Sequence, residues 1–188
     1  KSSPVQIPGT NWATGEKKVV ASNAQAAAIK TNGELWAWGY NAYGDLGLND
    51  TIYRSSPVQI PGTNWSNLGA FSQTGSWAAV KTDGTLWMWG QNGYGVLGQN
   101  ENNEHYSSPV QVPGTNWSAS ITGGQSSGMA VKTDGTLWAW GDSGQGGLGQ
   151  NNLIKYSSPV QIPGTNWTLD NVNSYTYGTG MRGAFKQS

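Results

Sequence analysis

The sequence has no cysteine, a single histidine and few charged residues. Without cysteine, disulfide bonds and thiolate metal sites are excluded. Only 11% of the residues are charged, ten acidic side chains offset ten basic ones, and the basic residues form no cluster. Because nucleic acid binding needs clustered Lys and Arg, we expect no nucleic acid partner. No apolar run approaches the ~20 residues that cross a bilayer, so we expect no membrane insertion.

Glycine (28) and tryptophan (11) are abundant, whereas phenylalanine occurs only twice. This balance is typical of short strands joined by tight turns. Two motifs recur along the whole chain. Leu-Trp-x-Trp-Gly stands at 35–39, 86–90 and 137–141. Ser-Ser-Pro-Val-Gln-Ile/Val-Pro-Gly-Thr-Asn-Trp stands at 2–12, 55–65, 107–117 and 157–167. A period near 50 residues indicates a propeller or another repeat array.

Each repeat contains a predicted β-hairpin. Residues 78–82 and 85–89 are apolar, β-prone runs on either side of Asp83-Gly84, and Asp-Gly is a strong signal for a two-residue hairpin turn. In the outgoing strand of the first copy, Trp36 and Trp38 share one face and Leu35 shares the other with its apolar neighbours. A strand with two apolar faces is expected to be buried on both sides. We therefore predict that the paired tryptophans are core residues between neighbouring units.

A glycine-rich loop follows each of these strands, at 39–47, 90–98 and 141–149. One leucine of each loop is predicted to fill the core beneath it: Leu46, Leu97 and Leu148. The Pro-Val-Gln-Ile segment predicts a short edge strand, where proline is tolerated, and Trp65 is expected to anchor the turn after it. The copies differ most in length between that tryptophan and the lysine before the next hairpin.

The order of these elements resembles the repeat of the regulator of chromosome condensation family. The shared elements are a hydrophobic strand, Asp-Gly, a second strand ending in Trp-Gly, and Asn-x-x-Gly-x-Leu-Gly. The resemblance covers the whole chain, residues 1–188. It implies an all-β fold, a β-propeller with four strands in each blade of about 50 residues and about seven blades in the ring. This chain would supply about three and a half blades, as repeats 1–54, 55–106, 107–156 and a partial repeat 157–188.

The chain departs from the family where repeats commonly carry a His-Thr pair before the Ala-Leu strand. The four positions hold Gln25-Ala26, Ser76-Trp77, Ser127-Gly128 and Met181-Arg182. The founding eukaryotic member is an exchange factor for a nuclear GTPase, and this role is not carried over. The near-identical copies and the proline linker more closely resemble repeats of bacterial and bacteriophage proteins. That likeness implies a large surface or appendage protein, located on a virion or an extracellular surface.

The proline linker occurs four times but the Leu-Trp-x-Trp-Gly strand only three times. The last residues, 184–188, align with the first strand of a hairpin whose second strand would be missing. Such an end would leave a hydrophobic sheet edge open. We therefore expect the chain to be part of a longer polypeptide. The alternative is that two chains pair as a homo-oligomer and complete one ring.

No residue pattern predicts an active site, a metal or a cofactor. The Gly-x-Gly-x-x-Gly matches at 93–98 and 144–149 are interpreted as turn glycines, because no helix follows them. His105 lies in a polar link and is expected to be solvated, with a weak cation site formed with Glu101 and Glu104 as the alternative. The carboxylates form no repeated pair of the kind that acid–base hydrolysis needs.

Positions that differ between copies are the candidates for partner binding. Most of them stand where the family pattern has its His-Thr pair, and two come from the corresponding loop of the last copy. The candidates are Gln25, Ser76, Trp77, Ser127, Met181, Arg182, Tyr175 and Tyr177. Trp77 is a tryptophan in only one copy, so it is either an exposed anchor for a protein or a sugar, or the filler of a local gap. A second variable set, Tyr53-Arg54, His105-Tyr106 and Lys155-Tyr156, is expected on another edge.

The sequence therefore predicts a non-enzymatic structural and binding module. We expect it in a phage tail fibre, another virion component or a bacterial surface assembly, with a protein or a glycan as its partner. A soluble lectin-like carbohydrate binder is the first alternative, and a guanine-nucleotide exchange factor is the second. Fold alone does not decide among them.

Overall fold

The structure is a computed structural model that describes residues 3–22, 24–71, 75–124, 126–168 and 185–186. Its regular elements are β-strands throughout, and this confirms the predicted all-β class. The strands are β1 (Val19–Ser22), β2 (Gln25–Ile29), β3 (Leu35–Gly39), β4 (Arg54–Ile60), β5 (Trp65–Phe71), β6 (Ser76–Lys81), β7 (Leu86–Gly90), β8 (Tyr106–Gln111), β9 (Trp117–Gly123), β10 (Ser127–Lys132), β11 (Leu137–Gly141), β12 (Tyr156–Ile162), β13 (Trp167–Thr168) and β14 (Phe185–Lys186). Nowhere in these ranges is a helix long and apolar enough to cross a membrane.

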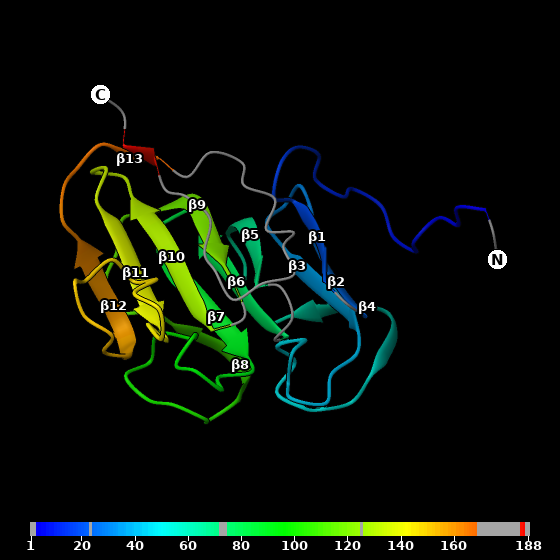
Figure 1. Cartoon of the computed structure of the whole chain (residues 1–188). Coiled ribbons are helices and arrows are strands. Elements are labelled where there is room, and N and C mark those ends of the chain that lie inside the picture. Colours follow the sequence, from blue (N-terminus) through cyan, green and yellow to red (C-terminus); the bar gives the residue numbers. More distant parts are fainter. Residues whose placement is uncertain (1–2, 23, 72–74, 125, 169–184, 187–188) are drawn as a thin grey trace.

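The strands form three antiparallel four-stranded sheets, and each sheet follows the order of the chain. The sheets are β1-β2-β3-β4, β5-β6-β7-β8 and β9-β10-β11-β12, and β13 pairs with β14. Figure 1 shows the sheets as a fan, and the first strands of neighbouring sheets, β1 with β5 and β5 with β9, are in contact. The sheets are therefore propeller blades, with β1, β5 and β9 on the inner side and β4, β8 and β12 on the outer side. We number them blades 1 to 3.

The predicted hairpins are present in all three blades, but Lys81 N donates to Thr85 O, so three residues rather than the predicted two form the turn. β6 and β7 pair in antiparallel register with Val80 opposite Leu86, and the turn between them has Gly84 at φ 77°. The hydroxyl and the backbone N–H of Thr85 both donate to the Asp83 carboxylate, at 2.6 and 2.9 Å. These hydrogen bonds hold the pKa of Asp83 below its ordinary value.

The proline segment forms the outer strand of a blade, as predicted, through its pairing with the tryptophan strand. Val58 of β4 lies opposite Ala37, and Ile60 lies opposite Leu35. The sheets are thus offset from the sequence repeats, because the segment that opens repeat 2 completes blade 1. The same Pro-Val-Gln-Ile sequence at 4–7 has no pairing strand among the described residues, and it runs away from the sheets (Figure 1).

The hydrophobic core lies between consecutive blades. One cluster joins Leu35 and Leu46 of blade 1 to Trp89 of blade 2, and a second joins Leu86 of blade 2 to Trp140 of blade 3. The indole N–H of each of these tryptophans also donates to a backbone carbonyl of the preceding blade. Trp89 Nε1 is 3.0 Å from Asp45 O, and Trp140 Nε1 is 2.6 Å from Val96 O.

These clusters confirm the predicted core role for Trp89, Trp140 and the loop leucines, whereas Trp36 and Trp38 of blade 1 are only partly buried. Leu46, Leu97 and Leu148 have no exposed surface. The first tryptophan of each strand, such as Trp87, is only half-buried. The predicted anchor Trp65 is buried, and its ring centre lies 6.2 Å from those of both Trp87 and Trp89.

The long variable segment of the first repeat links the inner strands of all three blades. Lys17 Nζ donates to Ala119 O of β9 at 2.9 Å, and Lys18 Nζ donates to Ser66 O and to Asn67 Oδ1 of β5. Burial lowers the pKa of Lys17 below its ordinary value. Lysine can reach so far because its long apolar stem packs along the protein while its amine finds a polar partner.

Candidate binding face

The two ends of the blades are built from different kinds of connection. Gln25 pairs with Gly39, and Gly39 pairs with Arg54, so the hairpin before β2 and the loop after β3 emerge at one end. We call this the loop end. It carries the inner hairpins and the long loops 40–53, 91–105 and 142–155, which lie along the lower edge of Figure 1. The opposite turn end carries the Asn-Gly and Asp-Gly turns. The described residues of both variable sets therefore lie at one end rather than on separate edges.

Three predicted binding residues occupy equivalent places, each at the first position of a second strand. Gln25, Ser76 and Ser127 begin β2, β6 and β10 and are all buried. Ser76 Oγ donates to Gln91 O at 2.7 Å, which joins its strand to the start of the long loop of the same blade. Their side chains thus support the loop end from within, so a direct contact of these side chains with a partner is no longer expected.

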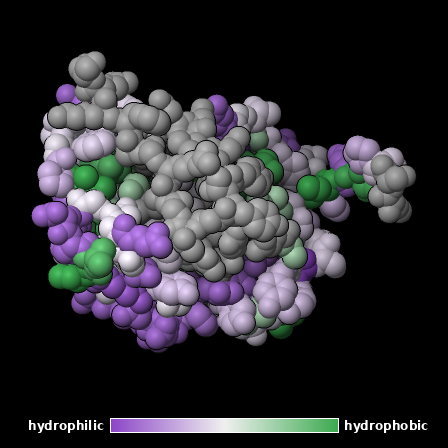
Figure 2. All heavy atoms as spheres, in the orientation of Figure 1, coloured by the Kyte–Doolittle hydropathy of each residue, from purple (hydrophilic) through white to green (hydrophobic). Residues whose placement is uncertain are grey.

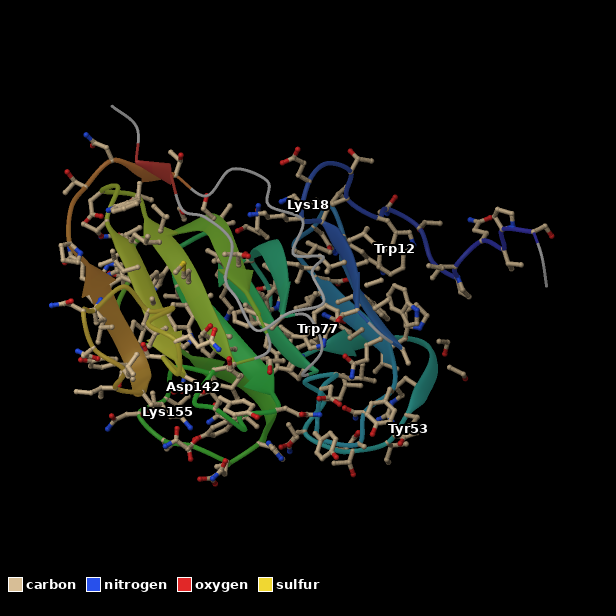
Figure 3. The ribbon with its side chains drawn as sticks, viewed as in Figure 1. Trp12, Lys18, Tyr53, Trp77, Asp142 and Lys155 are labelled. Carbon is tan, nitrogen blue, oxygen red and sulfur yellow. The ribbon has the colours of Figure 1, made fainter. Side chains whose placement is uncertain are left out.

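Trp77 is buried, and the alternative of an exposed anchor is wrong. Only 1% of its surface is accessible, and Figure 3 shows it in the interior between blades. Its Nε1 donates to Gln25 Oε1 of blade 1 at 3.1 Å, and its ring belongs to the core shared by blades 1 and 2. The gap-filling interpretation is therefore confirmed.

A buried carboxylate at the same junction does not stand out in the sequence. Asp45 is 1% exposed, and its Oδ2 accepts a hydrogen bond from Tyr43 N at 3.4 Å. Burial raises the pKa of Asp45 to about 6, an effect that hydrogen bonds from backbone N–H groups and from Gln25 only partly offset. The equivalent positions in the next two repeats are Val96 and Gly147. The difference between the copies at this position is the one sequence signal that marks it.

Each long loop is held by one buried polar side chain. In blade 1, Asn41 Nδ2 donates to Asp50 O and Ile52 O at 3.0 and 3.1 Å, and Asn41 Oδ1 accepts from Leu46 N at 2.8 Å. In blade 2, Asn92 Nδ2 donates to Glu101 O at 3.3 Å, and Asn92 Oδ1 accepts from Leu97 N at 3.0 Å. These side chains satisfy the backbone groups of an irregular loop and fix its shape. The Asn-x-x-Gly pattern is visible in the sequence, but only the structure shows that its asparagine holds the loop together.

The long loop of each of the first two blades is also bonded to the outer strand of the next blade, β8 or β12. Asn49 N donates to Ser107 O and Asn100 N donates to Ser157 O, both at 2.7 Å and both across a blade junction. A methyl group on Gly44 would lie 2.4 Å from Ser107 Cα, and Gly44 has φ 76°. A side chain at Gly44 would therefore separate the long loop of blade 1 from β8 of blade 2. The loop end is a rigid platform rather than a set of independent loops.

Large side chains project from this platform into solvent. They are Tyr43, Ile52, Tyr53, Tyr94, Leu153 and Ile154, each at least 43% exposed. Tyr53 stacks on Tyr40 with ring centres 4.9 Å apart, and it lies on the rim in Figure 3. Figure 2 shows a mostly hydrophilic rim interrupted by an apolar patch. Such amphipathic and apolar side chains in polar surroundings are typical of binding surfaces.

His105 is exposed as expected, and its Nδ1 accepts a hydrogen bond from Asn92 N at 3.1 Å. Glu101 Oε1 accepts from Asn92 Nδ2 at 2.9 Å. In the described ranges, no three His, Cys, Asp or Glu residues are placed to hold a metal ion together. The remaining candidates, Met181, Arg182, Tyr175 and Tyr177, lie outside the described residues and stay predictions.

Comparison with known families identifies these repeats. The model of the regulator of chromosome condensation (RCC1) repeat matches residues 32–67, 83–131 and 134–172, more than half of the chain. The Ultraviolet-B receptor UVR8 of Arabidopsis thaliana is 31% identical over 141 residues, which cover 71% of this chain and 32% of the receptor. The Protein RCC2 homolog of Danio rerio is 30% identical over 131 residues, 69% of this chain and 26% of that protein. The chain spans about a third or less of the length of these relatives.

Solved structures show the same fold. Human WBSCR16 superposes with a TM-score of 0.66 at 24% identity, over 77% of this chain and 38% of that one. Yeast RCC1 (Prp20), solved with Kap60 bound, gives a TM-score of 0.67 at 15% identity, over 79% of this chain and 38% of its own.

Proposed function

The chain belongs to the RCC1 repeat family, and from this premise we propose that it is a non-enzymatic structural module that binds a protein partner through its loop end. A rigid propeller with variable loops at one end is suited to recognition rather than to chemistry. A protein partner is the first expectation, because the yeast relative of the same fold was solved bound to a protein, Kap60.

One observation carries this proposal: the repeats differ at one end of the blades and agree at the other. At the loop end the long links 48–54, 99–106 and 150–156 share little sequence, whereas the Pro-Gly-Thr-Asn-Trp turns of the turn end are the same in every copy. Shared residues build the blade, and unlike residues are free to specialise. The platform is held by Asn41, Asn92 and the hydrogen bonds from the loops to the outer strands of the next blades, so partner contacts need little ordering of the backbone.

We place the module in a virion component such as a phage tail fibre, or in a bacterial surface assembly. The support is the sequence itself, because near-identical copies joined by one proline linker resemble repeats of such proteins. The buried Gln25, Ser76, Trp77 and Ser127 act in this scheme as supports of the loop end. Met181, Arg182, Tyr175 and Tyr177 remain candidates for direct contact.

A photo-crosslinking amino acid at two exposed positions tests the proposal. Ile52 lies at the loop end and Thr63 at the turn end, and both are exposed. In the intact natural particle or cell surface, we expect position 52 to crosslink to a second protein and position 63 to give little product. Equal crosslinking from both positions, or crosslinking from 63 alone, would contradict a loop-end function. Absence of the protein from purified particles and cell surfaces would contradict its placement.

A lectin-like function is the second candidate, favoured by the exposed tyrosine rings of the loop end, since an aromatic ring can stack on a sugar. Binding to a glycan array that is lost in Tyr43→Ala and Tyr53→Ala would support it. Guanine-nucleotide exchange is a third alternative on family grounds alone, and a nucleotide-release assay with the purified chain tests it.

A further inference from the structure

Charge is unevenly divided between the two ends of the blades. The described residues of the long loops and the strand starts after them, 40–54, 91–106 and 142–156, carry five carboxylates and two basic side chains. These are Asp45, Asp50, Glu101, Glu104 and Asp142 against Arg54 and Lys155. Arg54 is already paired with Asp50 at 2.6 Å. At the turn end, by contrast, Lys30, Lys81 and Lys132 are matched in number by Glu34, Asp83 and Asp134. The loop end therefore presents an acidic field, and it is complementary to a positively charged partner.

The two blade junctions differ in the side chain that contacts the exposed tyrosine of the long loop. At the junction of blades 2 and 3, Lys155 Nζ lies over the ring of Tyr94, 5.7 Å from its centre. Tyr43 is the equivalent tyrosine of blade 1, but the residue that meets it from blade 2 is His105, whose ring stands edge-on at 5.2 Å. An aromatic face attracts an ammonium or guanidinium group. The chain supplies that cation to Tyr94 but places no lysine or arginine at the same position beside Tyr43.

We propose that Tyr43, together with Glu104, the residue before His105, and with the Asp45 carboxylate below its backbone, binds a lysine or arginine side chain of the protein partner. This inference rests on the proposed function and names the chemistry of its contact. Tyr43 is 44% exposed. Glu104 precedes His105 on the exposed loop of blade 2, and the Asp45 carboxylate lies directly below the backbone of Tyr43. His105 stands at the position of Lys155 here, so the cation of the partner meets the part of the Tyr43 ring that His105 leaves exposed.

The backbone around Tyr43 is already fixed before any ligand binds. Its neighbour Asn41 is fixed by hydrogen bonds to Asp50, Ile52 and Leu46, and Gly44 packs against Ser107 of the next blade. Little backbone freedom is lost when a ligand meets a ring held in this way. A single cation–π contact at an exposed site is weak, so a lone lysine analogue should bind with a Kd well above about 1 mM.

Two matched small probes test the inference on the full chain. Nα-acetyl-lysine amide carries the charge, and its Nε-acetylated form keeps the stem without it. In NMR titrations we expect saturable shifts at Tyr43 and Glu104 with the charged probe and none with the neutral one. Tyr43→Phe should retain binding, whereas Tyr43→Ala and Glu104→Gln should each weaken it about threefold or more.

Lys155→Ala provides the sharpest variant, because it should expose Tyr94 and create a second site. We expect the charged probe to shift Tyr94 signals in Lys155→Ala and not in the parent chain. Equal shifts with both probes, or shifts confined to Asp83 and Asp134 at the turn end, would overturn the inference. Saturable binding of cellohexaose at Tyr43, without response to the charged probe, would replace it with glycan recognition. If crosslinking from position 52 succeeds while the charged probe fails, the inference falls and the proposed function stands.

Discussion

The two complete blade junctions differ in which blade supplies the large aromatic ring that fills the space between the inner strands. At the junction of blades 1 and 2, the large ring is Trp77 of the following blade, and the inner strand of blade 1 ends in Ser22. At the junction of blades 2 and 3, the large ring is Phe71, the last residue of the inner strand of the preceding blade. The position equivalent to Trp77 is then Gly128, and a methyl group there would lie 2.7 Å from Phe71 Cε1.

The junctions also differ in polarity. The first contains the Trp77–Gln25 hydrogen bond and the carboxylate of Asp45, whereas the second has Val96 at the position of Asp45. A large ring on either side fills the space, because interiors tolerate changes that conserve volume. Buried polar groups instead demand specific partners. The comparison teaches that blades of nearly identical sequence are not interchangeable, because each junction is matched across two repeats.

Transplanting the first arrangement into the second junction should have the largest effect. In Gly128→Trp the new ring meets Phe71 and also Trp140, whose Cε2 lies 2.9 Å from the position of an added Cβ. We expect a loss of more than about 3 kcal/mol in the free energy of unfolding, measured by urea denaturation. The double variant Phe71→Ala/Gly128→Trp should recover part of that loss. A double variant no more stable than Gly128→Trp would show that the two positions are not matched.

Removing the indole N–H that ties one blade to the next tests a feature that the junctions share. Trp89→Phe and Trp140→Phe leave Asp45 O and Val96 O without their indole donors. We expect each variant to lose about 2–3 kcal/mol, from the hydrogen bond and from the smaller ring together. Equal losses would show that the polar and apolar junctions depend on this link alike. A loss below about 0.5 kcal/mol in both would contradict its role.

Asp45→Asn should change the free energy of unfolding in a pH-dependent way, because only the first junction contains a buried carboxylate. The folded pKa of Asp45, about 6, lies above the unfolded value of 3.8, so the folded chain favours the protonated form. The stability contributed by this group is full below about pH 4 and is lost as the pH rises through 6. We therefore expect Asp45→Asn to be more stable than the parent by about 1–2 kcal/mol at pH 7.5 and nearly equal to it at pH 4. Urea denaturation at several pH values measures the difference.

Val96→Asn is the matched control for that experiment, because it places the same amide in the apolar junction, where the parent has no carboxylate. It should lower stability by a similar amount at every pH. A pH-independent effect of Asp45→Asn would contradict the raised pKa.

The sequence predicts what a single repeat determines and misses what two repeats determine together. The hairpin around Asp83 and the burial of Leu46 follow from turn chemistry and strand alternation within one copy. The burial of Trp77 depends on residues of the preceding blade that are far away in sequence, where Gln25 accepts its indole N–H and Ser22 stands at the position that Phe71 takes in blade 2. From one repeat alone, a residue such as Trp77 that differs between copies is compatible with both a contact surface and a core.

Local sequence is also insufficient where a strand needs a partner. Pro-Val-Gln-Ile forms an outer strand at 57–60, next to a tryptophan strand, while the same four residues at 4–7 are exposed. A strand is stabilised by its neighbours more than by its own propensity. For the same reason, the burial of Asp45 at the junction of blades 1 and 2 could not be predicted from the sequence of its glycine-rich loop.

The smallest effect is expected at the turn end, where all three blades agree. Lys81 Nζ lies over the rings of Trp65 and Trp87, 4.7 and 4.3 Å from their centres, and Lys30 and Lys132 repeat this arrangement. Lys81→Met keeps a flexible chain of similar length but removes the charge, so it should cost about 0.5–1 kcal/mol. Lys132→Met should cost the same, because these stacks lie away from the differences between the junctions. If the two variants differed by more than about 1 kcal/mol in urea denaturation, the unlike junctions would influence the turn end, and the blades could not be treated as a uniform frame with variation confined to the loop end.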